Sequence, residues 1–225
     1  MAVRGTTRLL KLAPDTGEDL PLRSLSPGHK VAVFYAPPSR EHEYDVKALR
    51  LLVSDQYNRS STGLLLVNFV LPDSSTHAPS GRTLLPNPLL LTDREVRRAK
   101  QGAFVFDVSA YRITMPAGGL FIVAEGIPEP PFVYAGDTLI RTSKNSPGPW
   151  VYVKLKRPVT GGTAKLKVVN ATEFVSLRDV RTTTEPQTWD YSPTKKSWTK
   201  RRLVYEKCPR CVISNAGMEL EVREL

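Results

Sequence analysis

Residues 102–127 read GAFVFDVSAYRITMPAGGLFIVAEGI and carry the clearest indication of the fold in the chain. It holds two apolar segments in which every second side chain is large, and such period-2 alternation predicts two β-strands, each with a core face. Between them, Pro116 withholds a backbone donor and the glycine pair at 118–119 permits positive φ, so the middle is predicted to connect the strands. The expected core side chains, on adjacent or near-adjacent strands, are Phe104, Phe106, Val108, Phe121 and Val123.

Similar short apolar segments occur on both sides of this stretch. Turn-forming residues separate them, and Gly161-Gly162 indicates a hairpin between two of them. Residues 72–88, rich in Pro and Gly, are predicted to be a long irregular loop, and residues 93–100 a helical turn or a polar connection. The expected strands cover residues 6–12 (short, at an edge), 29–35, 44–54, 63–71 (central), 89–91, 150–155, 164–169, two short strands within 188–198, and 218–222.

About ten to twelve short strands with almost no helix favour an all-β fold. No shift in composition marks a linker within the 225 residues. We therefore expect one domain over residues 1–225, a single antiparallel β-sandwich that is jelly-roll-like, with residues 1–28 as a peripheral segment and edge strand.

The positive charge is concentrated in one part of the chain. The net charge is +10 overall, and residues 141–210 alone carry 16 basic and 5 acidic side chains. Such a segment suits a polyanion, which could be a nucleic acid, an anionic glycan or a lipopolysaccharide. The alternative is that these charges form the solvated outer faces of strands.

Sequence motifs for catalysis and for cofactors are absent. Phosphate-binding, dinucleotide-binding, zinc-protease and nucleophile-elbow patterns are not found, so no cofactor and no enzymatic activity are predicted. Cys208 and Cys211 form one CxxC turn, which supplies only two of the four ligands of a structural zinc site. The chain has no second cysteine pair, so no metal is predicted. A glycosidase would need two carboxylates on one concave sheet, and the candidates are Asp107, Glu125 and Glu173. The alternative is that these carboxylates bind backbone donors or Lys and Arg at strand ends.

Aromatic residues gather in the same basic segment and suggest a binding surface. Flat rings stack on the apolar face of sugars, while neighbouring Lys side chains donate hydrogen bonds to hydroxyl or anionic groups. In the hairpin TWDYSPTKKSW, Trp189 and Tyr191 should share a face and Trp198 should return beside them. The alternative is that the tryptophans are core residues. The predicted ligand-binding residues are Trp150, Tyr152, Trp189, Tyr191, Trp198, Lys195 and Lys196.

The serial order of several segments resembles a known family. These segments are HKVAVFYAP (residues 29–37), TGLLLVNFVLPDSSTHAPSGRTLLPNPLLL (62–91), FVFDVSAYRITMPAGGLFIVAEGI (104–127), TWDYSPTKKSW (188–198) and NAGMELEV (215–222). They resemble the β-sandwich region of exported envelope proteins from gliding-type Gram-negative bacteria, which often follows a carboxypeptidase-like regulatory domain. The resemblance implies a jelly-roll-like fold and an envelope location, and it implies no activity. The CPRC turn departs from the family's pattern.

Three functions follow as hypotheses. The first is a non-catalytic cell-envelope or extracellular module that binds carbohydrate or an anionic glycan. The second is a structural or adhesion protein that contacts a protein of the envelope through a sheet edge. Single-stranded nucleic-acid binding is a minor alternative, disfavoured because no RNP-like motif or arginine-rich tail is present.

The expected location depends on how the N-terminus is read. No apolar run reaches the roughly 18 residues that a membrane span needs, so no membrane span is predicted. The segment MAVRGTTRLL does not match a signal peptide. The chain as given is expected in the cytoplasm, or outside the cell, in the periplasm or at the outer membrane if a signal peptide was trimmed.

Overall fold

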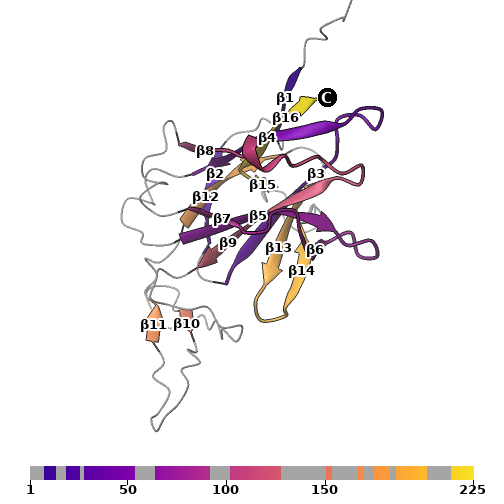
Figure 1. Cartoon of the computed structure of the whole chain (residues 1–225). Coiled ribbons are helices and arrows are strands. Elements are labelled where there is room, and N and C mark those ends of the chain that lie inside the picture. The colour runs from indigo at the N-terminus through magenta and orange to yellow at the C-terminus, as the bar shows by residue number, and fades with distance from the viewer. Residues whose placement is uncertain are drawn as a thin grey trace, which may run out of the picture.

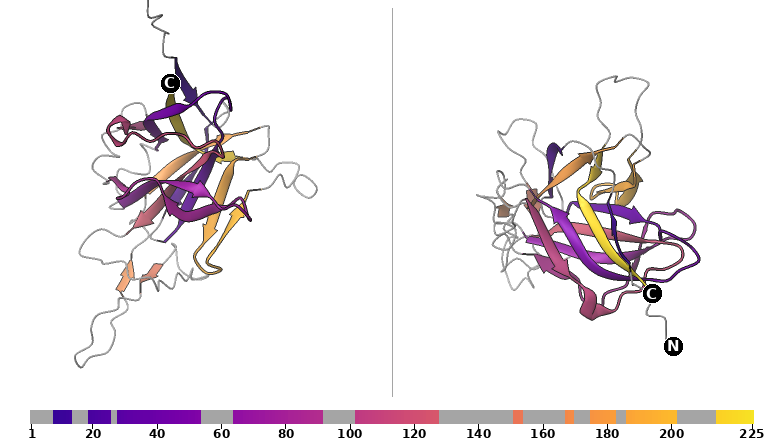
Figure 2. Two further views of the ribbon diagram at one scale, coloured as in Figure 1. Left: turned by 45° about the vertical axis from the view of Figure 1, so that its right-hand side comes forward. Right: turned by 90° about the horizontal axis from the view of Figure 1, so that it is seen from above.

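The protein is an antiparallel β-sandwich. A computed structural model describes residues 8–13, 19–25, 28–53, 64–91, 102–127, 151–153, 167–169, 175–182, 186–201 and 214–225. Within these ranges the only helical element is a single 3-10 turn, η2 (Ser109–Tyr111). Figure 1 shows a four-stranded sheet lying over a larger, curled sheet, and Figure 2 shows the same two layers from two further directions. No helix of the described part is long and apolar enough to cross a membrane.

The larger sheet has seven strands in the order β14-β13-β3-β9-β5-β6, with β7 also paired to β5. All of its pairs are antiparallel. As predicted, the strand that is apolar on both faces, β5, lies inside the sheet. The strands are β3 (Lys30–Tyr35), β5 (Leu64–Pro72), β6 (Pro79–Thr83), β7 (Leu89–Leu91), β9 (Leu120–Ile127), β13 (Thr188–Ser192) and β14 (Ser197–Lys200).

The smaller sheet has four strands in the order β1-β16-β4-β8. The N-terminal strand lies at its edge, as predicted, and the last strand of the chain pairs with β4. The chain crosses repeatedly between this sheet and the larger one, a feature shared with jelly rolls. The strands are β1 (Leu9–Leu12), β4 (Tyr44–Leu52), β8 (Ala103–Asp107) and β16 (Met218–Glu224).

Two smaller ladders complete the described structure. A three-stranded sheet has the order β15-β12-β2, and a bridge between Leu177 and Val53 connects it to the end of β4. The pair β10-β11 is the antiparallel hairpin expected on either side of Gly161-Gly162. The strands are β2 (Asp19–Leu25), β12 (Val175–Arg181), β15 (Ser214–Ala216), β10 (Val151–Val153) and β11 (Lys167–Val169).

One hydrophobic core lies between the sheets. Alternate residues of β3, β5 and β9 face it from the larger sheet, and those of β4 and β16 face it from the smaller one. The largest fully buried side chains are Phe69, Phe121, Leu49, Leu51, Leu65, Leu85, Leu91, Leu120, Ile122, Leu177, Met218 and Leu220. All of these belong to the main core except Phe121, which belongs to a second cluster on the opposite face of the larger sheet.

The predicted core face of residues 102–127 needs two corrections. The two strands are not adjacent, because β8 pairs with β4 in the smaller sheet and β9 pairs with β3 and β5 in the larger one. On β9 the main core receives Leu120, Ile122 and Ala124, whereas Phe121 and Val123 point to the other face. Both faces of β9 are apolar, so alternation alone could not distinguish them.

The β8 side chains face the core as predicted, but two of them are less buried than expected. Val108 is fully buried, whereas Phe104 and Phe106 are partly exposed and pack against the rim of the core. Their rings contact each other edge-on with centroids 4.7 Å apart. In the described structure β8 pairs only with β4, so its side chains are covered from one side.

The predicted loop over residues 72–88 is wrong in part. Residues Pro79–Thr83 form β6, which returns along β5 after a turn organised by Asp73. The Asp73 carboxylate accepts hydrogen bonds from the backbone and hydroxyl groups of Ser75 and Thr76, and these bonds lower its pKa. Strands β2, β12 and β15 were not predicted, because Pro21 lowers the strand propensity of β2, Asp179 interrupts the alternation of β12, and β15 has only three residues.

Candidate ligand-binding groove

The β13–β14 hairpin presents an aromatic pair on the outer face of the larger sheet. Trp189 and Tyr191 share this face because side chains alternate along a strand. Tyr191 pairs in register with Trp198 on β14, and the two ring centroids lie 5.2 Å apart at an interplanar angle of 61°. The predicted hairpin and its return of Trp198 to the aromatic face are therefore present.

An ion pair lies beside this aromatic pair. The Lys30 Nζ atom is 2.7 Å from Glu125 Oε2, and the two residues are register partners on β3 and β9. The Lys30 ammonium also lies 5.5 Å from the centroid of the Tyr191 ring, within the range of a cation–π contact. The Lys30 side chain is 30% exposed and that of Glu125 is 20% exposed, so both charges remain accessible to a ligand.

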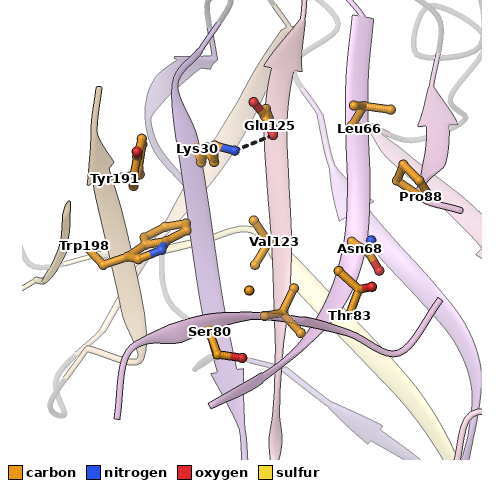
Figure 3. Close-up of a pocket in the computed structure, with 12 residues that line it drawn as sticks. Lys30, Leu66, Asn68, Ser80, Thr83, Pro88, Val123, Glu125, Tyr191 and Trp198 are labelled. Atoms are coloured by element: carbon orange, nitrogen blue, oxygen red, sulfur yellow. Dashed lines mark hydrogen bonds and ion pairs between the residues drawn. The ribbon is translucent and has the colours of Figure 1, made fainter. Parts of the chain in front are cut away.

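These side chains surround an open hollow of about 310 Å³, which we call the first hollow. Figure 3 shows Tyr191 and Trp198 on one side of the Lys30–Glu125 pair, with Asn68, Thr83 and Pro88 on the other. Apolar side chains make up most of its wall, and a few polar groups converge on it. The lining residues are Lys30, Leu66, Asn68, Val70, Ser80, Gly81, Thr83, Pro88, Val123, Glu125, Tyr191 and Trp198.

A small apolar cluster supports this face from beneath. Ala32, Val70 and Phe121 are buried there, separate from the main core, and Trp189 and Trp198 pack against them. Both indoles are half-buried, and neither reaches the main core. The alternative in which the hairpin tryptophans belong to the core between the sheets is therefore not what the structure shows.

Ion pairs on the opposite face of the hairpin hold its base in place. Arg201 follows β14, and its guanidinium binds Asp190 at 2.9 Å and Asp179 of β12 at 3.1 Å. The same group donates to the main-chain oxygen of Ser214 at 2.9 Å. Because Asp190 lies between Trp189 and Tyr191, one face of β13 is fixed by charge while the other carries the aromatic rings.

The remaining predicted site residues lie elsewhere. Lys195 and Lys196 are exposed at the tip of the β13–β14 turn, where Lys196 has a left-handed φ of 50°, and they do not line the first hollow. Trp150 lies outside the described residues. Tyr152 lies in β10, and its side chain is outside what the structure describes.

Sequence reasoning missed the polar residues of the first hollow. Lys30 begins a strand and Glu125 lies near the end of another, and they meet because β3 and β9 are antiparallel neighbours. Asn68 was visible as the single polar residue in an apolar strand, and its side-chain oxygen accepts a hydrogen bond from the Phe69 backbone at 2.8 Å. The available signal was a charged residue on an otherwise apolar face, but strand pairing was needed to bring these residues together.

Of the carboxylates that are candidates for glycoside hydrolysis, the two that the structure describes do not form a pair. Glu125 lies on the larger sheet, whereas Asp107 ends β8 in the smaller one. Asp107 accepts a hydrogen bond from the Ser109 backbone at 2.9 Å, and bonding to Ser109 lowers its pKa. Glu173 and the CPRC turn lie outside the described residues. No group of three or more potential metal-ligating side chains occurs in the described ranges.

Comparison of the chain with protein-family models, with curated proteins and with solved structures finds no match. The resemblance to exported envelope sandwiches and the expected location therefore stay predictions.

Proposed function

We propose that the protein is a non-catalytic carbohydrate-binding module, and that the first hollow binds a neutral sugar. One observation carries the proposal: the Tyr191–Trp198 aromatic pair lies beside an accessible Lys30–Glu125 ion pair in one hollow. Ligand sites typically combine apolar and aromatic walls with a few placed polar groups that fix orientation. A sugar ring has the matching chemistry, because it carries an apolar C–H face and hydroxyl groups around its edge.

The ion pair can recognise neighbouring hydroxyl groups. The Lys30 ammonium only donates hydrogen bonds and the Glu125 carboxylate only accepts them. Two adjacent hydroxyls of a sugar can therefore bind both partners at once, one as acceptor and one as donor. Asn68 and Thr83 add polar groups on the opposite wall.

The same pair favours a neutral ligand over an anionic one. An anionic group that approaches Lys30 also approaches the carboxylate of Glu125, only 2.7 Å from the ammonium. Like charges repel at such distances, so the attraction of Lys30 for an anion is largely offset. The first hollow is therefore distinct from the positive charge of residues 141–210, most of which lies outside the described ranges.

A glycan array followed by calorimetry tests the proposal. The array should contain neutral oligomers of glucose, galactose and mannose in several linkages, together with sulfated and uronic-acid glycans. The proposal expects binding to neutral members. Retention of sulfated or uronic-acid glycans alone would contradict it, and so would the absence of any retained glycan.

Variants then locate the site for a neutral glycan retained by the array. Trp198→Ala should weaken its binding about tenfold, which is about 1.4 kcal/mol, by removing one aromatic wall. Glu125→Gln should weaken it by removing the strongest acceptor. Lys195→Ala, on the same hairpin but outside the hollow, is the matched control and should bind as the wild type does. Trp198→Phe, which keeps an aromatic ring, controls for loss of packing.

A second candidate function, protein contact, is favoured by an exposed apolar area at another edge. Leu90 and Tyr111 are 48% and 49% exposed, and they line a separate hollow with Phe106 and Pro88. Exposed apolar patches mark interaction surfaces when they are contiguous. Leu90→Ser combined with Tyr111→Ser would then abolish co-purification of an envelope protein while leaving glycan binding unchanged.

A further inference from the structure

We infer that the outer face of the larger sheet carries one extended trough, which comprises the first hollow and a second one. We infer that its ligand is a neutral oligosaccharide whose successive rings occupy the two hollows. The inference rests on the proposed carbohydrate function. It adds a second subsite and makes the ligand a chain of sugars.

A second hollow of about 260 Å³ lies on the same face. Phe34 lines it from β3, four residues from Lys30 and therefore on the same side of the strand. Trp189 lines it from β13, two residues from Tyr191. The full set of lining residues is Phe34, Pro72, His77, Gly118, Phe121, Gln187, Trp189 and Lys200.

The same two hairpins flank both hollows. The β5–β6 hairpin contributes Ser80 and Thr83 to the first hollow, and Pro72 and His77 to the second. The β13–β14 hairpin contributes Tyr191 and Trp198 to the first, and Trp189 and Lys200 to the second. The strands β3 and β9 lie between the hairpins in the strand order, and Figure 3 shows Trp198 and Ser80, one from each hairpin, around the first hollow. The hollows are therefore two parts of one trough.

Aromatic rings follow the trough along its length. The Phe34 and Phe121 centroids lie 5.2 Å apart, and those of Phe121 and Trp189 lie 6.1 Å apart at 88°. Tyr191 and Trp198 continue the series into the first hollow. From Lys30 to Phe34 the trough covers four residues of β3, roughly 13 Å at the usual rise of a strand. That length exceeds a single sugar ring and leaves room for a chain of sugars.

The charges along the trough suit an uncharged chain. Lys30 and Glu125 neutralise each other in the first hollow, and the second adds one cation, Lys200, beside the amide of Gln187. A polyanion is instead attracted by many cations that follow its repeating charges. The described trough offers hydroxyl-binding groups next to apolar rings at each end.

Two glycines allow the hollows to be filled one at a time. Gly81 lines the first hollow and Gly118 lines the second. A Cβ atom added at either position meets no atom within 4 Å, and neither glycine has a left-handed φ. Gly81→Leu and Gly118→Leu should therefore fold and narrow one hollow each. Arg82→Leu introduces the same side chain on β6 at a residue that lines neither hollow, and it is the matched control.

The test measures binding of glucose, galactose and mannose oligomers of one to six units by calorimetry and NMR titration, with thermal melting to confirm the fold. The affinity of the wild type should rise about tenfold or more from one unit to four. Gly118→Leu should remove most of this gain and leave the single sugar within about twofold of the wild type. Gly81→Leu should weaken the binding of oligomers of every length, and Arg82→Leu should leave the binding of all of them unchanged.

The outcomes separate this inference from the proposed function. Two results would overturn the extended trough while leaving the first hollow as a sugar site. One is an affinity that is independent of chain length, and the other is a Gly118→Leu variant that binds long oligomers as tightly as the wild type does. A wild-type protein that binds none of these oligomers at any length overturns both.

Discussion

The Tyr35 hydroxyl donates a hydrogen bond to the main-chain oxygen of Met218. The bond joins β3 of the larger sheet to β16 of the smaller one, and it lies within the core. Burial raises the pKa of the Tyr35 phenol well above its usual value, and the nearby carboxylate of Glu219 raises it further. The sandwich thus places one polar link at the centre of an apolar interface.

This link predicts a pH-dependent effect of Tyr35→Phe. The variant should lose about 1 kcal/mol of unfolding free energy at neutral pH, because the buried carbonyl loses its donor. In the wild type the folded state keeps the phenol protonated, whereas the unfolded chain releases the proton near pH 10. The stabilising contribution is therefore complete below about pH 10 and declines above it.

Urea unfolding of wild type and variant from pH 7 to 11 measures this difference. The gap between the two proteins should shrink above pH 10. A gap that stays constant or widens would contradict the assigned role of the hydroxyl.

Core substitutions should follow the burial of the structure. Phe69→Ala should cost about 3–5 kcal/mol, because Phe69 is fully buried in the main core. Phe106→Ala should cost clearly less, because Phe106 is partly exposed at the rim of the core. Denaturant unfolding of both variants compares them directly, and equal losses would mean that Phe106 is as deeply buried as Phe69.

The partly buried Arg201 predicts a large loss of stability when it is replaced. Arg201→Gln removes the cation that faces Asp179 and Asp190, so two carboxylates remain without it, and we expect a loss of about 3–5 kcal/mol. Lys195→Gln, an exposed basic residue on the same hairpin, should change stability by less than about 0.5 kcal/mol. Thermal melting of the two variants gives the comparison, and similar melting temperatures would contradict a structural role for the ion pairs.

Salt should separate the two kinds of binding. Any affinity for polyanions is expected in residues 141–210 and should fall steeply as salt rises, because phosphate or sulfate contacts release counterions. Binding of a neutral glycan should change little when the salt concentration rises from about 50 to about 500 mM, a range over which interactions between charges become strongly screened. Heparin retention that survives high salt unchanged would contradict the first expectation.

The sequence predicted the fold class and the aromatic hairpin because both depend on local signals. Alternation identifies strands, and Ser192-Pro193 marks the turn that returns Trp198 beside Tyr191. The sequence could not assign the core face of β9, because Phe121 and Ile122 are equally apolar. It also missed β6, because Pro79 and Gly81 lower strand propensity while pairing with β5 compensates.

The polar residues of the first hollow could not be predicted from the sequence, for a different reason. Lys30 and Glu125 are 95 residues apart, and only the pairing of β3 with β9 brings them together. Glu125 and Asp107 are candidates for a carboxylate pair by residue type, but strand order places them in different sheets. Pairing over long sequence separations depends on the whole sheet, whereas alternation depends only on neighbouring residues.

The most direct test of the sugar-binding groove is the indole N–H spectrum of the three tryptophans during titration with a neutral tetrasaccharide retained by the array. Single Trp→Phe variants assign the three signals. If the tetrasaccharide occupies the trough, the Trp189 and Trp198 signals should shift together and saturate. Glu125→Gln should raise the tetrasaccharide concentration that is needed for saturation. Signals from Trp189 and Trp198 that do not move, or a shift confined to Trp150, would contradict the account.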